Sequence, residues 1–96
     1  MLELYIISKT QSTPEWPEKL DLKLAGRLDS KVFHNLQKKG IIEEEFNYFE
    51  DFRWNAKYIK NKLEQLKHSV DTDLVKLRSL LAPAVSISAE LVAFCD

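Results

Sequence analysis

The sequence predicts a small, mostly α-helical bundle of 96 residues, with short strands at the N- and C-terminal segments as the open alternative. Two observations predict it: apolar residues recur at helical spacing through the second half of the chain, and capping residues stand at the ends of those segments. With 45% hydrophobic residues, a chain of this length can fold without a metal or disulfide. Because no linker-like stretch or internal repeat is present, residues 1–96 are expected to form a single domain.

The first third of the chain has the least regular pattern. Apolar residues alternate with other types over residues 2–6 and again over 20–24, a spacing that fits either a strand or a short helix. Between these segments, residues 10–17 read as a loop, because two prolines there fix local backbone angles. Secondary structure before residue 29 therefore stays open.

A helix is predicted over residues 30–39 from signals at both of its ends. Asp29 is a good N-cap, and Gly40 can adopt the left-handed conformation that ends many helices. Ile41 then stands where it can contact Leu36, as the Schellman ending favours.

A second helix is predicted from about Asn55 to His68, with Asn55 as its cap. Its apolar stripe has spacings of 4, 3, 4, 3 and 4, and consists of Phe52, Ala56, Ile59, Leu63, Leu66 and Val70. We expect this stripe to face the core. If the whole of 52–70 is helical, Trp54 and Tyr58 point away from the stripe, so they either pack under another element or are exposed.

The last third continues the helical pattern from Asp71, a plausible cap, through the leucines of residues 74–81. Pro83 should end or kink this helix near Ala82, because proline lacks the N–H and clashes with the preceding turn. Residues 85–94 also alternate, so a strand is the alternative to a helix there. If both termini are strands, they could pair with each other, since a lone strand leaves its backbone groups unpaired.

The residues that usually carry catalysis or bind metals are sparse. His34 and His68 have no cysteine or carboxylate at a recurrent zinc-ligand spacing, and Cys95, the only cysteine, lies in an apolar tail. Two glycines cannot build a phosphate-binding loop. We therefore predict no enzyme activity, no catalytic residue, no metal site and no cofactor; a small enzyme working through Glu and His is the least favoured alternative.

Residues 43–54 are the most distinctive segment, with five carboxylates and five aromatic rings. The net charge is −1, and five basic residues follow in 52–70, so no broad positive face is available for nucleic-acid phosphates. Carboxylates and rings together suit a basic protein partner, although five such acids can also form a merely solvated face. The predicted partner-binding residues are Glu43, Glu44, Glu45, Tyr48, Glu50, Asp51, Trp54 and Tyr58.

The run from Gly40 to Asn55, centred on Asp51-Phe52-Arg53-Trp54, resembles small bacterial immunity proteins that are encoded beside polymorphic toxins. The amphipathic helix after it and the ending Leu-Val-Ala-Phe-Cys-Asp extend the resemblance. It implies an antitoxin-like inhibitor that binds and blocks a cognate toxin domain, and it assigns no contact residue. The acidic segment favours a basic toxin, with a nuclease as the best match.

A different class of function remains open: a non-catalytic adaptor or regulatory domain that uses the same surface outside any toxin system. The N-terminus lacks the features of a signal peptide, and no run of about 18 apolar residues could span a bilayer. We therefore expect a cytoplasmic protein without direct contact with membrane or nucleic acid.

Overall fold

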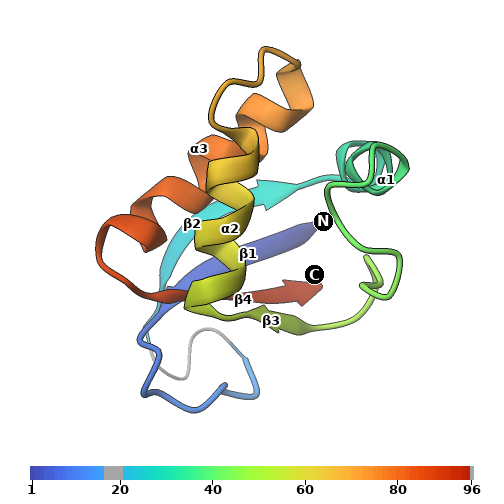
Figure 1. Cartoon of the computed structure of the whole chain (residues 1–96). Coiled ribbons are helices and arrows are strands. Elements are labelled where there is room, and N and C mark those ends of the chain that lie inside the picture. The colour runs from blue at the N-terminus through green and yellow to red at the C-terminus, as the bar shows by residue number, and fades with distance from the viewer. Residues whose placement is uncertain (17–20, 96) are drawn as a thin grey trace.

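The computed structural model describes residues 1–16 and 21–95. Its elements follow the order β1 (Leu2–Ile7), β2 (Lys23–Leu28), α1 (Ser30–Lys38), β3 (Phe52–Trp54), α2 (Ala56–Leu66), α3 (Thr72–Ser86) and β4 (Glu90–Cys95). The prediction of a mostly helical bundle is wrong, because four strands form one antiparallel sheet against which the helices pack (Figure 1). Of the residues predicted as alternating or loop, Pro17 and Leu20 lie outside the described ranges.

The sheet has the strand order β2-β1-β4-β3, so the two strands from the chain ends form its centre. Their antiparallel register runs from Leu2 opposite Cys95 to Ile7 opposite Glu90. The conditional prediction that the terminal segments pair with each other is therefore confirmed. In Figure 1, the ends of the chain lie close together at one end of the sheet.

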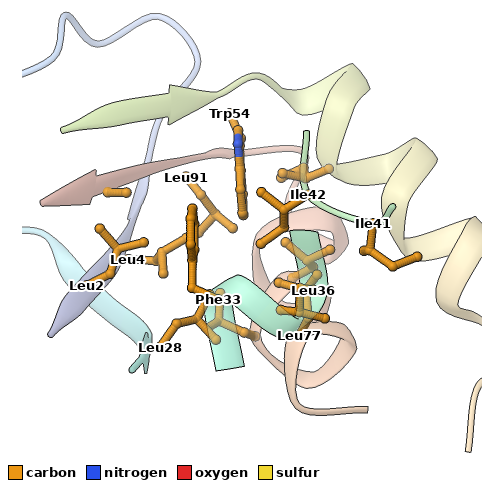
Figure 2. Packing of buried hydrophobic residues seen from close by; sticks show 14 of the residues in the cluster. Leu2, Leu4, Leu28, Phe33, Leu36, Ile41, Ile42, Trp54, Leu77 and Leu91 are labelled. Carbon is orange, nitrogen blue, oxygen red and sulfur yellow. The ribbon is translucent and has the colours of Figure 1, made fainter. Parts of the chain in front are cut away.

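One face of the sheet carries the main core. Helices α2 and α3 cross this face, and α1 lies beside its end (Figure 1). Leu4 and Leu91 point from the central strands toward Phe33 of α1 and Leu77 of α3, as Figure 2 shows. All four side chains are at most 1% exposed, so burial of apolar surface on this face supplies most of the drive to fold.

The opposite face carries a smaller cluster of Ile7, Val92 and Phe94, with Tyr5 and Leu22 packed against it. Strand β4 is thus buried on both faces, and its apolar residues form a continuous run rather than a clean alternation. Periodicity alone does not distinguish such a run from a buried helix.

The first predicted helix is confirmed with both of its ends. The Asp29 side chain accepts a hydrogen bond from the Val32 N–H at 2.8 Å. At the other end Gly40 has φ +76°, and the Ile41 N–H donates to the Leu36 carbonyl at 2.9 Å, the bond expected of a Schellman ending.

The second predicted helix is also confirmed, with Asn55 capping the Tyr58 N–H at 2.8 Å. The apolar stripe faces the core at most of its positions. Ile59 and Leu66 are fully buried, and Phe52 packs against the core from β3 rather than from the helix. Val70, beyond the helix end, is 94% exposed, so the stripe is wrong there.

The third helix begins after its predicted cap, Asp71, but it does not end at Ala82. It continues through Pro83 to Ser86, so the predicted end of the helix near Ala82 is wrong. Proline has no N–H, so the carbonyl of Ser79, four residues before Pro83, receives no helical hydrogen bond from it. Ser79 and Pro83 are both exposed. Water can solvate that carbonyl, which lowers the cost of the missing bond. None of the helices within the described residues has the length and apolar run needed to cross a membrane.

Candidate interaction surface

The carboxylate-rich segment is a loop between α1 and β3, and we call residues 43–51 the acidic loop. Its backbone is bound to α1, because the Gln37 Nε2 donates hydrogen bonds to the carbonyls of Glu43 at 3.1 Å and Phe46 at 2.8 Å. Further along, the Asn47 Oδ1 accepts from the Phe49 N–H at 2.9 Å, which forms an Asx turn. The acidic loop therefore has a defined shape before any partner arrives.

Two rings of the acidic loop point inward. Phe46 lies with its ring centroid 5.0 Å from Phe52 and 6.0 Å from Trp54, and Tyr48 lies 5.6 Å from Phe33. Tyr48 is only 7% exposed. These rings fasten the loop to the core, so Tyr48, a predicted partner-binding residue, presents almost no surface to a partner.

Trp54 lies in β3 rather than on a helix, and it is only 2% exposed. Its ring stacks on Tyr58 with centroids 5.2 Å apart and an interplanar angle of 28°. Of the two outcomes left open for these rings, packing under another element is the one observed, since Phe46 of the acidic loop covers both. Trp54, a predicted partner-binding residue, therefore offers almost no surface to a partner.

Glu43 is held by contacts inside the protein. Its carboxylate accepts from the Tyr58 hydroxyl at 2.5 Å and from the Lys62 Nζ at 2.7 Å, and so links the acidic loop to α2. Burial works to raise the pKa of Glu43, but the hydrogen bonds from Lys62 and Tyr58 outweigh it and leave this pKa below its usual value. Burial, reinforced by the hydrogen bond to Glu43, raises the pKa of Tyr58, so its hydroxyl stays protonated and donates.

The string Asp51-Phe52-Arg53-Trp54 holds the fold together. Asp51 accepts from the Cys95 N–H at 3.0 Å, at the end of β4. The Arg53 Nε donates to Glu90 at 2.9 Å, while its other nitrogens donate to the segment after β1, at residues 8, 11 and 13. Asp51 and Arg53 therefore connect distant segments of the fold, while Phe52 and Trp54 pack against each other in the core with ring centroids 5.2 Å apart.

Glu44, Glu45 and Glu50 remain exposed, and they line a polar hollow of about 380 Å³ beside His34 of α1. We call this the acidic hollow. None of the three carboxylates forms an ion pair with another residue in the described ranges. Phe49, the sequence neighbour of Glu50, is 71% exposed and does not line the hollow.

Phe49 was absent from the predicted site residues. It is one of four rings within seven consecutive positions, and the sequence does not tell which of them point outward. The Asx turn at Asn47 provides the only local signal, because it fixes the backbone at Phe49. Phe46 and Tyr48 point inward because they pack against elements that are distant in the sequence, and the local sequence does not show this.

An unpaired carboxylate accepts charge-assisted hydrogen bonds from arginine or lysine, and an exposed phenyl ring supplies apolar contact area. No group of three or more His, Cys, Asp or Glu side chains in residues 1–16 and 21–95 is arranged to hold a metal ion. The acidic hollow with Phe49 thus has the chemistry to receive a basic side chain of a protein partner.

Comparison with protein-family models, curated protein sequences and solved structures finds no match for this chain.

Proposed function

We propose that this protein is an immunity protein that binds a cognate, basic toxin domain through the acidic hollow and Phe49, and thereby blocks the toxin. The toxin's most suitable class is a nuclease, because its active site must attract phosphates and therefore carries positive charge. The protein would act in the cytoplasm of the cell that makes it, without a cofactor and without a catalytic step.

The observation that carries this proposal is the separation of roles within the acidic loop. Glu43, Phe46 and Tyr48 fasten the loop to the core, whereas Glu44 and Glu45 face solvent without a partner in the described residues. A surface that is rigid before binding loses less conformational entropy when a partner docks. Unpaired carboxylates on such a surface can stand in for the phosphates of a nucleic acid.

Electrostatics favours fast capture by this surface. Three exposed carboxylates around one hollow create a local negative potential, although the whole chain has a net charge of only −1. Such a field steers a basic partner and raises its association rate, most strongly at low ionic strength. Rapid capture matters for an inhibitor that must act before the toxin reaches its substrate.

A non-catalytic adaptor would use the same surface, so the two functions are separated by their partner. The test is inhibition of the protein encoded by the adjacent gene, measured by titrating purified chain against its toxic activity. Stoichiometric inhibition with a 1:1 complex is expected. Loss of toxicity at far lower ratios would indicate turnover and an enzyme, and absence of any complex would refute the immunity proposal.

A matched pair of variants tests Phe49 as the anchor. Phe49→Ala removes an exposed ring of the acidic loop, and Val70→Ala removes an apolar side chain that is 94% exposed on the α2–α3 turn. Phe49→Ala should speed dissociation of the complex about tenfold or more, because anchors act mainly on the off-rate. Val70→Ala should leave dissociation unchanged; equal effects would assign the interface elsewhere.

A further inference from the structure

A second hollowed surface lies at the other end of the molecule, where β1 and α3 end and α2 and β4 begin. Two adjoining hollows of about 310 and 320 Å³ share Lys9, Ser88 and Ala89 in their walls. We call them together the lysine groove. In Figure 1 the α3–β4 turn lies at the left end of the molecule, and the segment between α1 and β3 lies at the right end.

The lysine groove has an apolar lining with a positive rim. Val85 and Ala89 line the first hollow, and Ile87, 66% exposed, borders the second. Lys9 joins both hollows, while Lys57 and Lys60 of α2 line the first. None of these lysines forms an ion pair with a residue in the described ranges.

Glu90, the carboxylate next in sequence to this groove, is already engaged. It accepts from the Arg53 Nε at 2.9 Å and from the Ala56 N–H at 3.2 Å, and it does not line either hollow. Among the residues that the structure describes, the groove therefore presents positive charge over apolar surface and no lining carboxylate. An occupant that fits it combines carboxylates with an apolar side chain.

This chain itself carries a surface of that chemistry. The acidic loop carries the exposed Phe49 together with the exposed Glu44, Glu45 and Glu50, and a hollow of about 310 Å³ has room for its phenyl ring. The three carboxylates, which form no ion pair within the described residues, match the three lysines in number and are opposite to them in charge. We propose that the lysine groove binds the acidic loop of a second copy of this chain.

Because the two surfaces lie at opposite ends of the fold, one molecule cannot close the contact on itself. The contact is head-to-tail, and each added copy again exposes one acidic loop and one lysine groove, so association continues as concentration rises. Charge attraction between exposed groups is screened by salt. Self-association is therefore strongest at low ionic strength and high protein concentration.

The inference does not depend on the toxin. If the immunity proposal also holds, the toxin competes for the acidic loop and disperses the assembly, because one loop cannot occupy both sites. A protein that self-associates without inhibiting any toxin would leave this inference intact and refute only the immunity proposal. A protein that inhibits a toxin but stays monomeric would refute only this inference.

Sedimentation velocity over a concentration series tests the contact, at about 20 mM and about 500 mM salt. The groove variant carries Gln in place of Lys9, Lys57 and Lys60, and the loop variant carries Gln in place of Glu44, Glu45 and Glu50. Each variant alone should remain monomeric, while a mixture of the two should form a dimer and nothing larger. Only one intact loop and one intact groove then meet, so the chain of contacts stops after two copies.

A charge-matched control carries Gln in place of Lys31, Lys67 and Lys76, exposed lysines that line neither hollow of the groove. It should self-associate like the parent, whereas Phe49→Ala should weaken association about tenfold. A parent protein that stays monomeric at about 1 mM in low salt would overturn the inference. So would a mixture that assembles beyond two copies, or a monomeric parent whose groove binds vesicles of anionic lipid.

Discussion

Replacing Trp54 by Ala and by Phe should give two very different losses of stability. The side chain is 2% exposed and is surrounded by Phe46, Phe52 and Tyr58, with ring centroids 5.2 to 6.0 Å away. Truncation to Ala deletes the ring and leaves a cavity. Such truncations of large aromatic residues in a core cost about 3–5 kcal/mol.

The Phe substitution keeps a ring in the cluster and removes the indole nitrogen. That nitrogen is buried and has no hydrogen-bond partner among the described residues, so folding leaves its N–H unpaired. An unpaired buried donor costs about 1–3 kcal/mol, and its removal offsets part of the lost packing area. Trp54→Phe should therefore cost less than about 1.5 kcal/mol.

Urea denaturation followed by circular dichroism measures both values, because fluorescence would lose one of its two tryptophans. A loss below about 1 kcal/mol for Trp54→Ala would contradict the placement of Trp54 in the core. If Trp54→Phe costs as much as Trp54→Ala, the indole N–H stabilises the fold and the reasoning on the unpaired donor is refuted.

Two further predictions concern backbone strain and acid sensitivity. Ser88 has φ +55°, a conformation that glycine adopts more easily than serine, so Ser88→Gly should stabilise the protein by about 0.5–1 kcal/mol. Gly40 has φ +76°, so Gly40→Ala should destabilise the protein by about 1 kcal/mol. Thermal unfolding measures both changes. The pKa of Glu43 is lower in the folded protein than its usual 4.5, so its ion pair contributes stability above that pH and loses it as the pH falls through the folded value. The stability difference between the parent and Glu43→Gln should accordingly shrink between pH 6 and pH 3, which urea denaturation at each pH measures; a constant difference would show that the pKa of Glu43 is not lowered by folding.

Helix positions were predictable because helix ends are encoded locally. Asp29, Asn55 and Asp71 each cap a backbone N–H within three residues of themselves, and all three were identified from sequence. Pro83 misled the prediction, because the cost of a proline depends on whether the orphaned carbonyl reaches water. That exposure is a property of the packed fold.

The sheet could not be predicted with the same security. Strands β1 and β4 lie at opposite ends of the chain, and their pairing depends on contacts between residues such as Leu2 and Cys95. The apolar residues of 2–6 and 85–94 alternate, but over such short segments this spacing fits a helix as well as a strand. The sequence therefore indicated that terminal strands would pair if they formed, without deciding that they form.

The candidate surface was predictable in charge but not in detail. Which carboxylates stay free depends on partners far along the chain: Lys62 engages Glu43 from α2, and the Cys95 N–H engages Asp51 from β4. The same holds for the rings, since Trp54 is buried while Phe49 is exposed. The composition of residues 43–54 therefore predicted where the candidate surface lies. The fold determines which of these residues pack against the core and which are exposed to solvent.

The proposal that the acidic loop captures a basic toxin is tested most directly by the association rate of the chain with the proposed toxin, measured by stopped flow at several salt concentrations. Two variants with the same net charge are compared: Glu44→Lys with Glu45→Lys in the acidic loop, and Glu15→Lys with Glu64→Lys at exposed positions elsewhere. The account predicts that the first pair slows association about tenfold or more at low salt and flattens its salt dependence, while the second pair changes it little. Equal rates for the two pairs would contradict the account, because the acidic loop would then contribute only to the overall charge.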